Sequence, residues 1–484
     1  MSEELGITIK KSDDFSKWYD EICQKAELSD LRYNVKGFIV FRPWATRIMN
    51  LMYEILEKEL QEKGHVPALF PAVIPESNFH LESKHVEGFT PEVFWITEHG
   101  KSEKLEEKLA LRPTSETAMY KMYSIWIRSW RDLPLKIYQR CQVWRYEGKA
   151  TRPFIRSREF HWIEAHDVFA TKEGAMNQVK EDMIIAENTL HKEYGIPFIF
   201  FQRPEHDKFP GAVHTYAADS LLPDGKVLQQ PSTHLLGQNF AKPFNVKFVD
   251  RDGKEKYGWQ TCYGPCVSRM VASVISVHGD DKGLVLPPKI APIQVIIIPI
   301  LNGKKTEILK KCEEIKKELD EESFRVEIDK REEYTPGWKF NYWELKGVPI
   351  RVEIGPNDIK NEQAVVVRRD NGEKTKVREI NLNEKIRVTL EEIQQKLIKK
   401  ADKFFEEHLS EAKTMNELKK IVKENGGLVK VNWCGSTECA EWIKEKTGGG
   451  DIRGTRFDKR EKSDDKCIYC GKSANSVVYV GKSY

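Results

Sequence analysis

Two predicted strands enclose a strongly basic loop in the first half of the chain. Residues 135–146 and 160–169 are rich in apolar and aromatic residues, and the loop at 148–158 between them carries four lysines and arginines. Arg145 and Glu147 lie two residues apart near the end of the first strand, so their side chains point to the same face. A guanidinium beside a carboxylate suits a ligand with an anionic end and a donor-rich end, as a nucleotide or an amino acid has.

Short strands joined by turns continue the first part of the chain. Pro223-Asp224-Gly225 is a turn signal between two of them. Strands connected in this way favour an antiparallel sheet over a doubly wound one. We expect further strands at 66–74, 197–202, 215–221 and 226–230, and helices at 44–63 and 177–194.

The pattern of predicted helices and strands changes at the proline-rich segment 286–292, which is typical of a stiff boundary between domains. Helices and strands then alternate, as in a compact α/β domain. The expected strands are 294–300, 324–328, 349–354 and 363–369, and the expected helices are 304–319 and 338–345. A long charged helix at 390–410 leads to a small third unit. The expected domains are 1–287, 288–400 and 401–484, in keeping with the length of 484 residues.

Four of the nine cysteines cluster near the C-terminus. Two close pairs, separated by 27 intervening residues, suit a closed tetrahedral thiolate site for zinc. Such a site would organise a small domain that has few core residues. The alternative is four reduced thiols in a flexible tail. The residues of the cluster are Cys434, Cys439, Cys467 and Cys470.

Charge and hydropathy restrict the partners and the compartment. The net charge is only +3, so any RNA binding must rest on local patches rather than on a broad basic coat. The N-terminus lacks the apolar run of a secretory signal, and the apolar stretch 295–301 is too short to cross a membrane. The scattered cysteines do not form a secreted disulfide framework. We therefore expect a cytoplasmic protein with neither a membrane nor DNA as partner.

Several motifs resemble those of the class II aminoacyl-tRNA synthetases. Arg145-x-Glu147, the basic loop and Phe160 resemble motif 2 of that class, and Gly264-Pro265-Cys266-Val267-Ser268-Arg269 resembles a degraded motif 3. Arg112-Pro113-Thr114-Ser115-Glu116-Thr117 is similar to the amino-acid-binding loop of the prolyl-tRNA synthetases. The segment 336–351 is similar to their anticodon-binding domain. The resemblance extends from about Phe15 to Tyr484.

This resemblance implies a fold and an activity. The fold would be an α+β catalytic domain on a mixed, mainly antiparallel class II sheet, an α/β anticodon-binding domain and a small C-terminal zinc-binding α+β domain. The activity would be that of an ATP-dependent ligase: proline and Mg-ATP give prolyl-adenylate, and proline then passes to the 3′ end of tRNA(Pro). The helix and strand at 44–75 resemble motif 1, which implies a homodimer.

The resemblance also implies roles for individual residues in ATP binding. A carboxylate that attacks a phosphate needs a fixed cation that neutralises both groups, and a bidentate guanidinium suits this better than an ammonium. The family places its motif 2 arginine on the α-phosphate and near the amino-acid carboxylate, and the matching residue is Arg145. The other implied ATP contacts are Glu147 and Phe160 at adenine, Arg156 at the phosphates, Arg269 on the opposite face of adenine, and Gln229 and Ser232.

The proline pocket needs a cation, acceptors for the secondary ammonium and an apolar wall. Arg145 supplies the cation, and the resemblance implies that Thr114 and Glu116 accept from the imino nitrogen. The implied ring walls are Trp162, His166 and Phe209, and a further histidine in the pocket is His234.

Three alternatives remain open: a threonyl enzyme, a noncatalytic RNA-binding paralog, and an amino-acid-activating enzyme that does not use tRNA. Threonyl relatives hold zinc in the pocket, and no Cys/His triplet is evident at the matching places, which favours proline. Only about 90 residues separate Asp167 from Gly258, so the sequence resembles the archaeal and eukaryotic type without an editing insertion. We therefore expect some alanine and cysteine to be activated and not cleared in cis, because a missing methylene changes binding by only about 1–3 kcal/mol.

Overall fold

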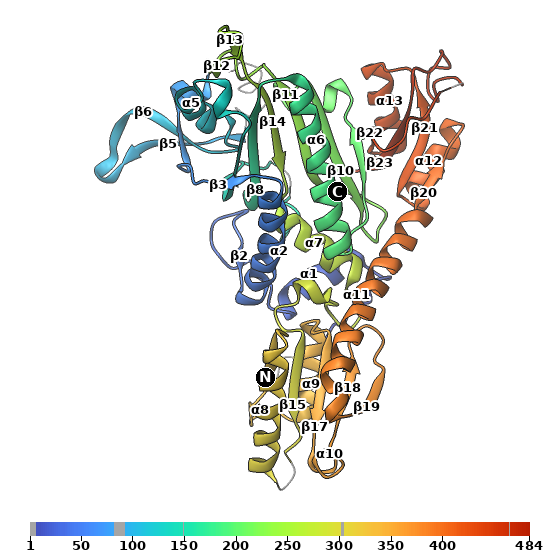
Figure 1. The fold of residues 1–484 in the computed structure, drawn as a ribbon. Coiled ribbons are helices and arrows are strands. Elements are labelled where there is room, and N and C mark those ends of the chain that lie inside the picture. Colours follow the sequence, from blue (N-terminus) through green and yellow to red (C-terminus); the bar gives the residue numbers. More distant parts are fainter. Residues whose placement is uncertain (1–5, 82–91, 149, 302–303, 464) are drawn as a thin grey trace.

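The chain folds around one large sheet (Figure 1). The computed structural model describes all residues except 1–5, 82–91, 149, 302–303 and 464. The sheet has eleven strands in the order β20-β21-β23-β22-β9-β10-β11-β14-β8-β7-β3. The β3–β7 and β20–β21 pairs are parallel and the other pairs are antiparallel, which confirms the mixed, mainly antiparallel sheet.

The strands of this sheet come from two distant parts of the chain. The first part supplies β3 (Val66–Pro67), β7 (Leu135–Trp144), β8 (Glu159–Phe169), β9 (Ile199–Gln202), β10 (His214–Leu221), β11 (Val227–Gly237) and β14 (Trp259–Gly264). The C-terminal part supplies β20 (Leu409–Glu411), β21 (Leu428–Trp433), β22 (Gly450–Arg456) and β23 (Ser476–Lys482). The pairing of β22 with β9 joins the two parts.

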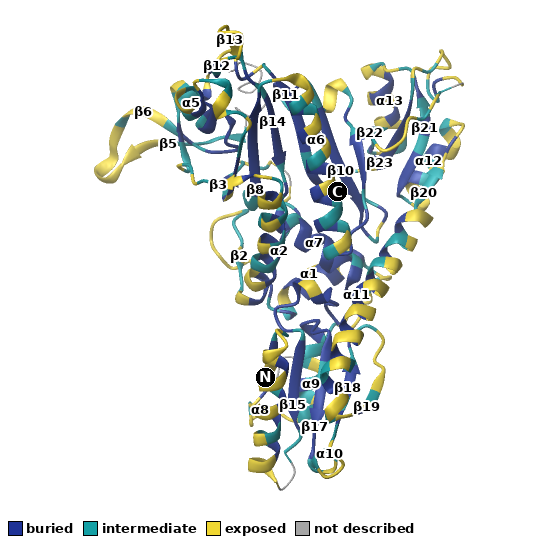
Figure 2. Cartoon of the chain, viewed as in Figure 1, coloured by how far each residue is buried: buried dark blue, intermediate teal, exposed yellow. Residues whose placement is uncertain are grey.

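Helices bury their apolar stripes against the central sheet, and the dark interior of Figure 2 follows this layer. The N-terminus of α2 has Pro43 at its first turn, where a missing N–H costs nothing. Its C-terminus is followed by Gly64 at φ +85°, the left-handed conformation expected there. The helices of this layer are α1 (Phe15–Lys25), α2 (Pro43–Glu62), α6 (Lys172–Ala186), the π-helix η4 (Glu187–Glu193) and α7 (Val267–His278).

A smaller unit packs beside β7 and projects a hairpin from the molecule (Figure 1). The predicted strand at 66–74 is wrong: Val66 and Pro67 pair with β7, whereas Val73 begins a strand of this separate sheet. Pro67 and Pro71 lack the N–H donors that a continuous strand needs. The unit consists of β4 (Val73–Pro75), α3 (Glu76–Phe79), β5 (Phe94–His99), β6 (Glu103–Leu111) and α5 (Glu116–Trp126).

The expected α/β unit follows the proline-rich segment. Its five strands have the order β16-β15-β17-β18-β19, with β15 parallel to both neighbours and the other pairs antiparallel. Its elements are β15 (Val295–Pro299), α8 (Lys305–Glu321), β16 (Val326–Ile328), α9 (Pro336–Leu345), β17 (Ile350–Ile354), α10 (Pro356–Lys360), β18 (Gln363–Arg368) and β19 (Lys374–Arg378).

Helix α11 (Leu382–Glu407) runs from this α/β unit to the C-terminal part of the large sheet (Figure 1). It begins at Leu382 rather than at Leu390, and the expected domain boundary at 400/401 lies inside it. The C-terminal part also contains α12 (Met415–Glu424) and α13 (Thr437–Thr447). The remaining short elements are β1 (Ser29–Asp30), β2 (Val40–Phe41), η2 (Gly100–Ser102), η3 (Trp130–Asp132), η5 (Glu205–Asp207), β12 (Lys247–Val249), β13 (Glu255–Tyr257), η6 (Pro288–Ile290) and η7 (Glu379–Asn381).

Two features bear on the expectations about membranes and insertions. No helix among the described residues is long and apolar enough to cross a membrane. Residues 170–258, all of which the structure describes, belong to the sheet, to its helices and to short connections, so no separate domain is inserted there.

Candidate active site

A cavity of about 320 Å³ opens above the middle strands of the large sheet. Side chains from β8, β11, β14, the loop before α5 and the start of α7 line it. The strand register explains this, because β8, β14, β11 and β10 are neighbours and present alternate side chains to one face. The predicted residues on its wall are Thr114, Glu116, Arg145, Phe160, Trp162, His166, Phe209, Gln229, Ser232, His234 and Arg269.

Arg145 presents its guanidinium to this cavity. Its Nε donates to the main-chain oxygen of Pro113 at 3.0 Å, and its guanidinium carbon lies 5.2 Å from the Phe160 ring centre and 6.0 Å from that of Trp162. Burial lowers the pKa of Arg145 from its ordinary value, a direction that the charge of Glu92 opposes. A partly desolvated cation of this kind interacts strongly with an anionic ligand because the local dielectric is low.

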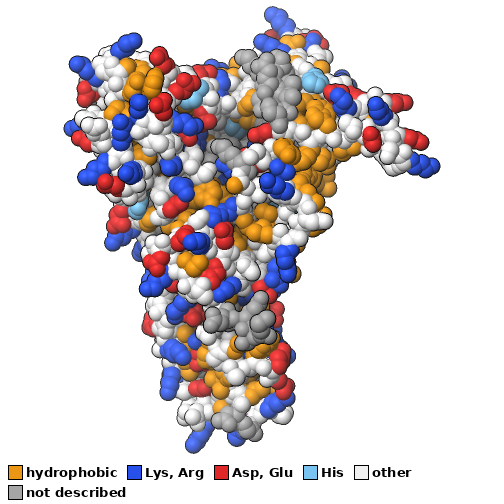
Figure 3. Space-filling model, turned by 180° about the vertical axis from the view of Figure 1, so that it is seen from behind, with side chains coloured by type: hydrophobic (Ala, Val, Ile, Leu, Met, Phe, Trp, Pro, Cys, Tyr) orange, Lys and Arg blue, Asp and Glu red, His pale blue; other side chains and the backbone are white. Residues whose placement is uncertain are grey.

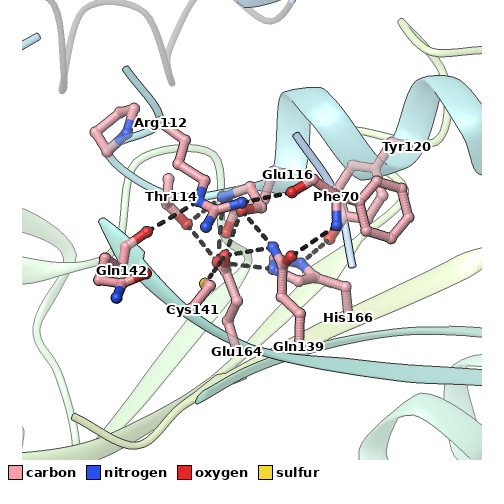
Figure 4. A network of polar contacts seen from close by, with 12 residues as sticks. Phe70, Arg112, Thr114, Glu116, Tyr120, Gln139, Cys141, Gln142, Glu164 and His166 are labelled. Atoms are coloured by element: carbon pink, nitrogen blue, oxygen red, sulfur yellow. Dashed lines mark hydrogen bonds and ion pairs between the residues drawn. The ribbon is translucent and has the colours of Figure 1, made fainter. Parts of the chain in front are cut away.

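A buried network holds the acidic end of the cavity (Figure 4). The hydroxyl of Thr114 donates to Glu116 at 2.5 Å, and Glu116 is 1% exposed. Glu164 accepts from the Ser115 hydroxyl, the Ser115 N–H at 3.1 Å and Gln139 at 2.9 Å, and it lies 3.2 Å from His166 Nε2. This network fixes the loop that carries Thr114 and Glu116.

In this network, burial and the neighbouring groups act in opposite directions on the pKa values of Glu164 and His166. Burial alone would raise the pKa of Glu164, but hydrogen bonds from His166 and Ser115 and the charge of His166 outweigh it and lower that pKa. Burial would likewise lower the pKa of His166, yet the hydrogen bond to Glu164 and the charges of Glu116 and Glu164 raise it. Both shifts favour the charged form of each group beneath Glu116.

The pKa of His234 is shifted in the opposite direction to that of His166. Its Nδ1 lies 2.9 Å from the Thr215 hydroxyl and its Nε2 3.0 Å from the Ser232 hydroxyl, and its ring packs 4.6 Å from that of Phe209. Burial, reinforced by the charges of His166 and Arg145, lowers the pKa of His234 to about 3. His234 is therefore neutral at pH 7 and adds a polar but uncharged wall.

Arg269 lies at the start of α7, beside β11. Its Nη1 donates to the main-chain oxygen of Gln229 at 3.1 Å. Its buried Nε–H has no hydrogen-bond partner within the described part of the chain. A buried donor of this kind is costly unless a ligand accepts from it.

Two predicted ATP contacts lie outside the cavity wall. Arg156 forms a 3.4 Å ion pair with Glu147, and its Nη2 donates to the main-chain oxygen of Tyr484 at 3.1 Å. The basic loop is thus held partly by the C-terminal residue. Arg152 also contacts Tyr484 and pairs with Asp20, while Lys149 lies outside the described residues.

The pocket contains residues that the sequence reasoning missed. Arg203 lines the cavity although it follows the apolar strand β9, and its partner Asp219 lies on β10. A charged residue at the end of such an apolar strand was the available signal. Glu164 of β8 also lines the cavity, and no short motif marks it.

Among the residues that the structure describes, two groups of side chains have the donor set of a metal site. Cys434, Cys439, Cys467 and Cys470 offer four thiols whose sulfurs lie within 4.8 Å of one another, which fits tetrahedral zinc. A main-chain hydrogen bond at Lys472 lowers the pKa of Cys470 to about 7, whereas burial raises that of Cys439.

The second group lies in the cavity and was not expected. Glu116, His166 and Cys262 converge from three elements that are far apart in the sequence. A carboxylate takes the place of one Cys or His ligand, so the search for a Cys/His triplet did not find it. Both ring nitrogens of His166 already have partners, Tyr120 at 3.1 Å and Glu164 at 3.2 Å.

Three known families match successive parts of the chain. The family described as tRNA synthetase class II core domain (G, H, P, S and T) matches residues 94–278, and the anticodon binding domain matches residues 294–400. The family described as prolyl-tRNA synthetase, C-terminal, matches residues 415–484.

Similar whole chains are also known. A proline–tRNA ligase of Thermofilum pendens is 54% identical, and the alignment covers 100% of both chains. One of Methanopyrus kandleri is 45% identical over 97% of this chain and 96% of its own. Giardia lamblia prolyl-tRNA synthetase, solved in complex with prolyl-adenylate, superposes with a TM-score of 0.95 at 37% identity over 99% of this chain and 100% of its own. Its counterpart from Cryptosporidium parvum, complexed with halofuginone and AMPPNP, gives 0.94 at 38% identity over 100% of both chains. With identity and fold in agreement over its whole length, the chain belongs to the prolyl-tRNA synthetase family of class II aminoacyl-tRNA synthetases.

Proposed function

We propose that the chain joins proline to tRNA(Pro) in two steps. In the first, a carboxylate oxygen of proline attacks the α-phosphorus of ATP, and the bond to the pyrophosphate leaving group breaks. In the second, the terminal ribose hydroxyl of the tRNA attacks the carbonyl carbon of prolyl-adenylate, and AMP leaves. The observation that carries the proposal is one cavity whose wall combines the guanidinium groups of Arg145 and Arg269 with the buried carboxylate of Glu116.

Arg145 would bind the reacting anions. The carboxylate and the α-phosphate repel one another, and a guanidinium between them lowers the energy of their approach and of the charge that builds on phosphorus. The contact of Arg145 with the Pro113 oxygen fixes its direction before substrate arrives, which supports this role.

Glu116 and Thr114 would hold the secondary ammonium of proline. A buried carboxylate binds a cation more strongly than one in water does. Trp162, Phe209 and the uncharged His234 would enclose the ring, with His166 held behind Glu116.

The nucleotide would lie across β8 and α7. Phe160 and Arg269 would enclose adenine, and Gln229 and Ser232 would contact the nucleotide from β11. Glu147 and Arg156, which form an ion pair with each other, would contact the nucleotide from the side of the basic loop. Mg²⁺ bound with ATP neutralises charge on the pyrophosphate, and we assign no ligands to it.

The C-terminal cysteines would hold one structural zinc ion. The four thiols come from the end of β21, from α13 and from the loop before β23, so a zinc ion would join all three segments. We place the domains at about 1–287, 288–400 and 401–484, with α11 shared by the last two.

The anticodon would bind near α9. The rings of Tyr334, Trp338 and Tyr342 form a stack, with centres 3.7 and 5.1 Å apart and an angle of 12° in each pair. The guanidinium of Arg331 lies 4.5 to 5.2 Å from these rings. Stacked aromatic rings beside a cation suit unpaired bases.

Two charged residues at the end of α9 contact other elements. Glu344 pairs with Lys282 at 3.0 Å, and Lys346 is buried and pairs with Glu27.

A homodimer and a cytoplasmic location complete the proposal. Val66 of the edge strand β3 is 54% exposed and Leu69, just after that strand, 86%. Figure 3 shows apolar side chains gathered near the base of the projecting β5–β6 hairpin. An apolar sheet edge of this kind favours association with a second copy. The nine cysteines are unpaired, which suits a reducing compartment.

ATP–pyrophosphate exchange with each of the twenty amino acids, without tRNA, tests the activity. We expect exchange to be strongest with proline and to be lost in Arg145→Ala, while Arg140→Ala on the other face of β7 retains it. Exchange that prefers threonine would keep the fold and overturn the pocket assignment. No exchange with any amino acid would favour a noncatalytic paralog.

Hydrolysis of mischarged tRNA, or proofreading, is a second property that an experiment in solution can test. We expect alanine to be activated weakly and alanyl-tRNA(Pro) to persist, because residues 170–258 contain no separate domain. Rapid hydrolysis of alanyl-tRNA(Pro) by the purified protein would contradict this.

A further inference from the structure

A buried carboxylate joins the C-terminal part of the chain to the wall of the cavity. Asp219 of β10 is fully buried and accepts four hydrogen bonds of 2.8–2.9 Å, two from Arg203 and two from Arg453. Each guanidinium meets the carboxylate as a fork, the geometry that arginine favours over lysine. Arg203 follows β9, whereas Arg453 belongs to β22, about 250 residues later in the sequence.

The backbone of β22 is shaped to aim Arg453 at this carboxylate. The pairing of β22 with β23 shifts register between Ile452 and Gly454, so Arg453 is the extra residue of a β-bulge. Bulges redirect a side chain and occur next to functional sites. Gly454 has φ +117°, and a Cβ atom there would lie 2.0 Å from the main-chain oxygen of Gln202. Only glycine allows β22 to approach β9 this closely.

Arg203 connects Asp219 to residues that line the cavity. Its Nη2 donates to the side-chain oxygen of Gln229 at 3.5 Å, and its Nε lies 3.7 Å from Asp207. Gln229, Asp207 and Arg203 itself all line the cavity. The main chain of Arg203 also donates to Thr215, whose hydroxyl contacts His234 at 2.9 Å. Arg203 therefore touches both the nucleotide-facing and the proline-facing walls.

Asp219, Arg203 and Arg453 together also affect the charge beside the substrate. Arg203 shares Asp219 with Arg453, and its second partner, Asp207, is half-exposed, so solvent screens that carboxylate more than it screens the buried guanidinium. The same guanidinium of Arg203 is among the charges that lower the pKa of His234. A fixed positive charge there favours a bound carboxylate or adenylate, because the interior screens it weakly.

We propose that Arg453 is a positioning residue for amino-acid activation, which acts through Asp219 on Arg203 and Gln229. This inference rests on the proposed function and deepens it: the C-terminal part of the chain completes the proline site in cis. A bond that served only to attach the C-terminal part would leave proline binding unchanged once the protein is folded.

Exchange kinetics with Arg453→Met and Arg453→Lys test the proposal. Lysine keeps the charge and the fold but loses the fork. We expect both variants to raise KM for proline by roughly ten- to hundredfold, as displacement of a positioned group does, with a smaller rise in KM for ATP, because the contact of Arg203 with Gln229 is long, at 3.5 Å. Arg456→Met is the matched control, because Arg456 lies on the same strand but pairs with Asp458. It should behave as the unaltered protein.

Exchange by the unaltered protein with proline is measured first, so a failure of the proposed function is seen by itself. If Arg453→Met does not fold, Arg453→Lys carries the test. An unchanged KM for proline in folded Arg453→Lys would overturn the proposal. So would equal increases in KM for proline and for ATP, which indicate general loosening of the site.

Discussion

Glu116 tests the proline site at the level of a single charge. It is buried, accepts from Thr114, and has the length of Gln, so Glu116→Gln removes the charge and retains the shape. A hydrogen bond to a charged group contributes about 1.5–3 kcal/mol, so we expect KM for proline to rise roughly ten- to hundredfold, and KM for ATP to stay the same. Steady-state exchange at varied proline and ATP concentrations measures both.

Glu106→Gln is the control for this variant, since Glu106 is exposed on the β5–β6 hairpin. If Glu116→Gln changed both KM values equally, the carboxylate would serve to hold the loop rather than to bind the substrate amine.

Residues that line the cavity were easier to find in the sequence than residues that contact other residues. Arg145, Phe160 and Glu116 belong to short motifs, and they meet in one cavity. Arg203, Asp219 and Arg453 belong to no local motif, because their partners are distant in the sequence and only the sheet brings them together. Glu344 and Lys346 also join elements, since their partners Lys282 and Glu27 are distant in the sequence.

At the scale of elements, apolar periodicity predicted whether a segment is a helix or a strand better than it predicted where the segment begins and ends. The strands β7 and β8 and the helix α2 were expected from apolar spacing, and they lie where that spacing occurs. Helix α11 began earlier than predicted because its first turns, from Leu382, bury Ile386 and Thr389 against the α/β unit. Tertiary packing of this kind leaves little trace in local propensity.

His191 tests how α11 docks on the catalytic part. Its Nδ1 lies 2.7 Å from Glu187, and its Nε2 lies 2.8 Å from Asp402 of α11. The hydrogen bond to Glu187, together with Asp402 and against partial burial, raises the pKa of His191 from 6.5 to about 9. A group with a raised folded pKa stabilises fully below its unfolded value, and the stabilisation is lost as the pH rises through the folded value.

We therefore expect the unfolding midpoint in urea to fall between pH 6.5 and 9 through this group. The fall should be smaller in His191→Gln than in the unaltered protein. His206→Gln, which alters an exposed histidine of η5, should keep the original pH dependence. An identical pH profile for His191→Gln would show that the imidazolium does not stabilise this contact.

At the scale of the whole molecule, the sequence predicted three units but not the sheet that the first and the third share. Pairing of β22 with β9 makes eleven strands continuous across parts of the chain that sequence order separates. Strand order between distant segments has no local signal, since any two edge strands can pair. The C-terminal unit therefore depends on its neighbour as well as on its own small core.

The cysteine cluster should add to that core through zinc. We expect one zinc ion per chain, and Cys434→Ser should lose it and lower the melting temperature, because unfolded thiols do not bind metal as well. Metal content and thermal unfolding measure this. Cys266→Ser, outside the cluster, should keep the zinc, whereas an unchanged zinc content in Cys434→Ser would rule out this site.

Helix α9, which carries most of the aromatic stack, lies in a different part of the molecule (Figure 1) from the strands β8, β11 and β14, which line the cavity, so the two steps of the reaction should separate. Base stacking on an aromatic ring contributes about 1–3 kcal/mol. Tyr334→Ala and Trp338→Leu should therefore reduce kcat/KM for tRNA(Pro) roughly ten- to hundredfold and leave proline-dependent exchange unchanged. Trp442→Leu, which alters a stacked aromatic pair of the C-terminal part, is the control. Equal losses of exchange and charging would mean that α9 supports the catalytic part rather than the tRNA, because a base-binding surface has no effect before the tRNA is bound.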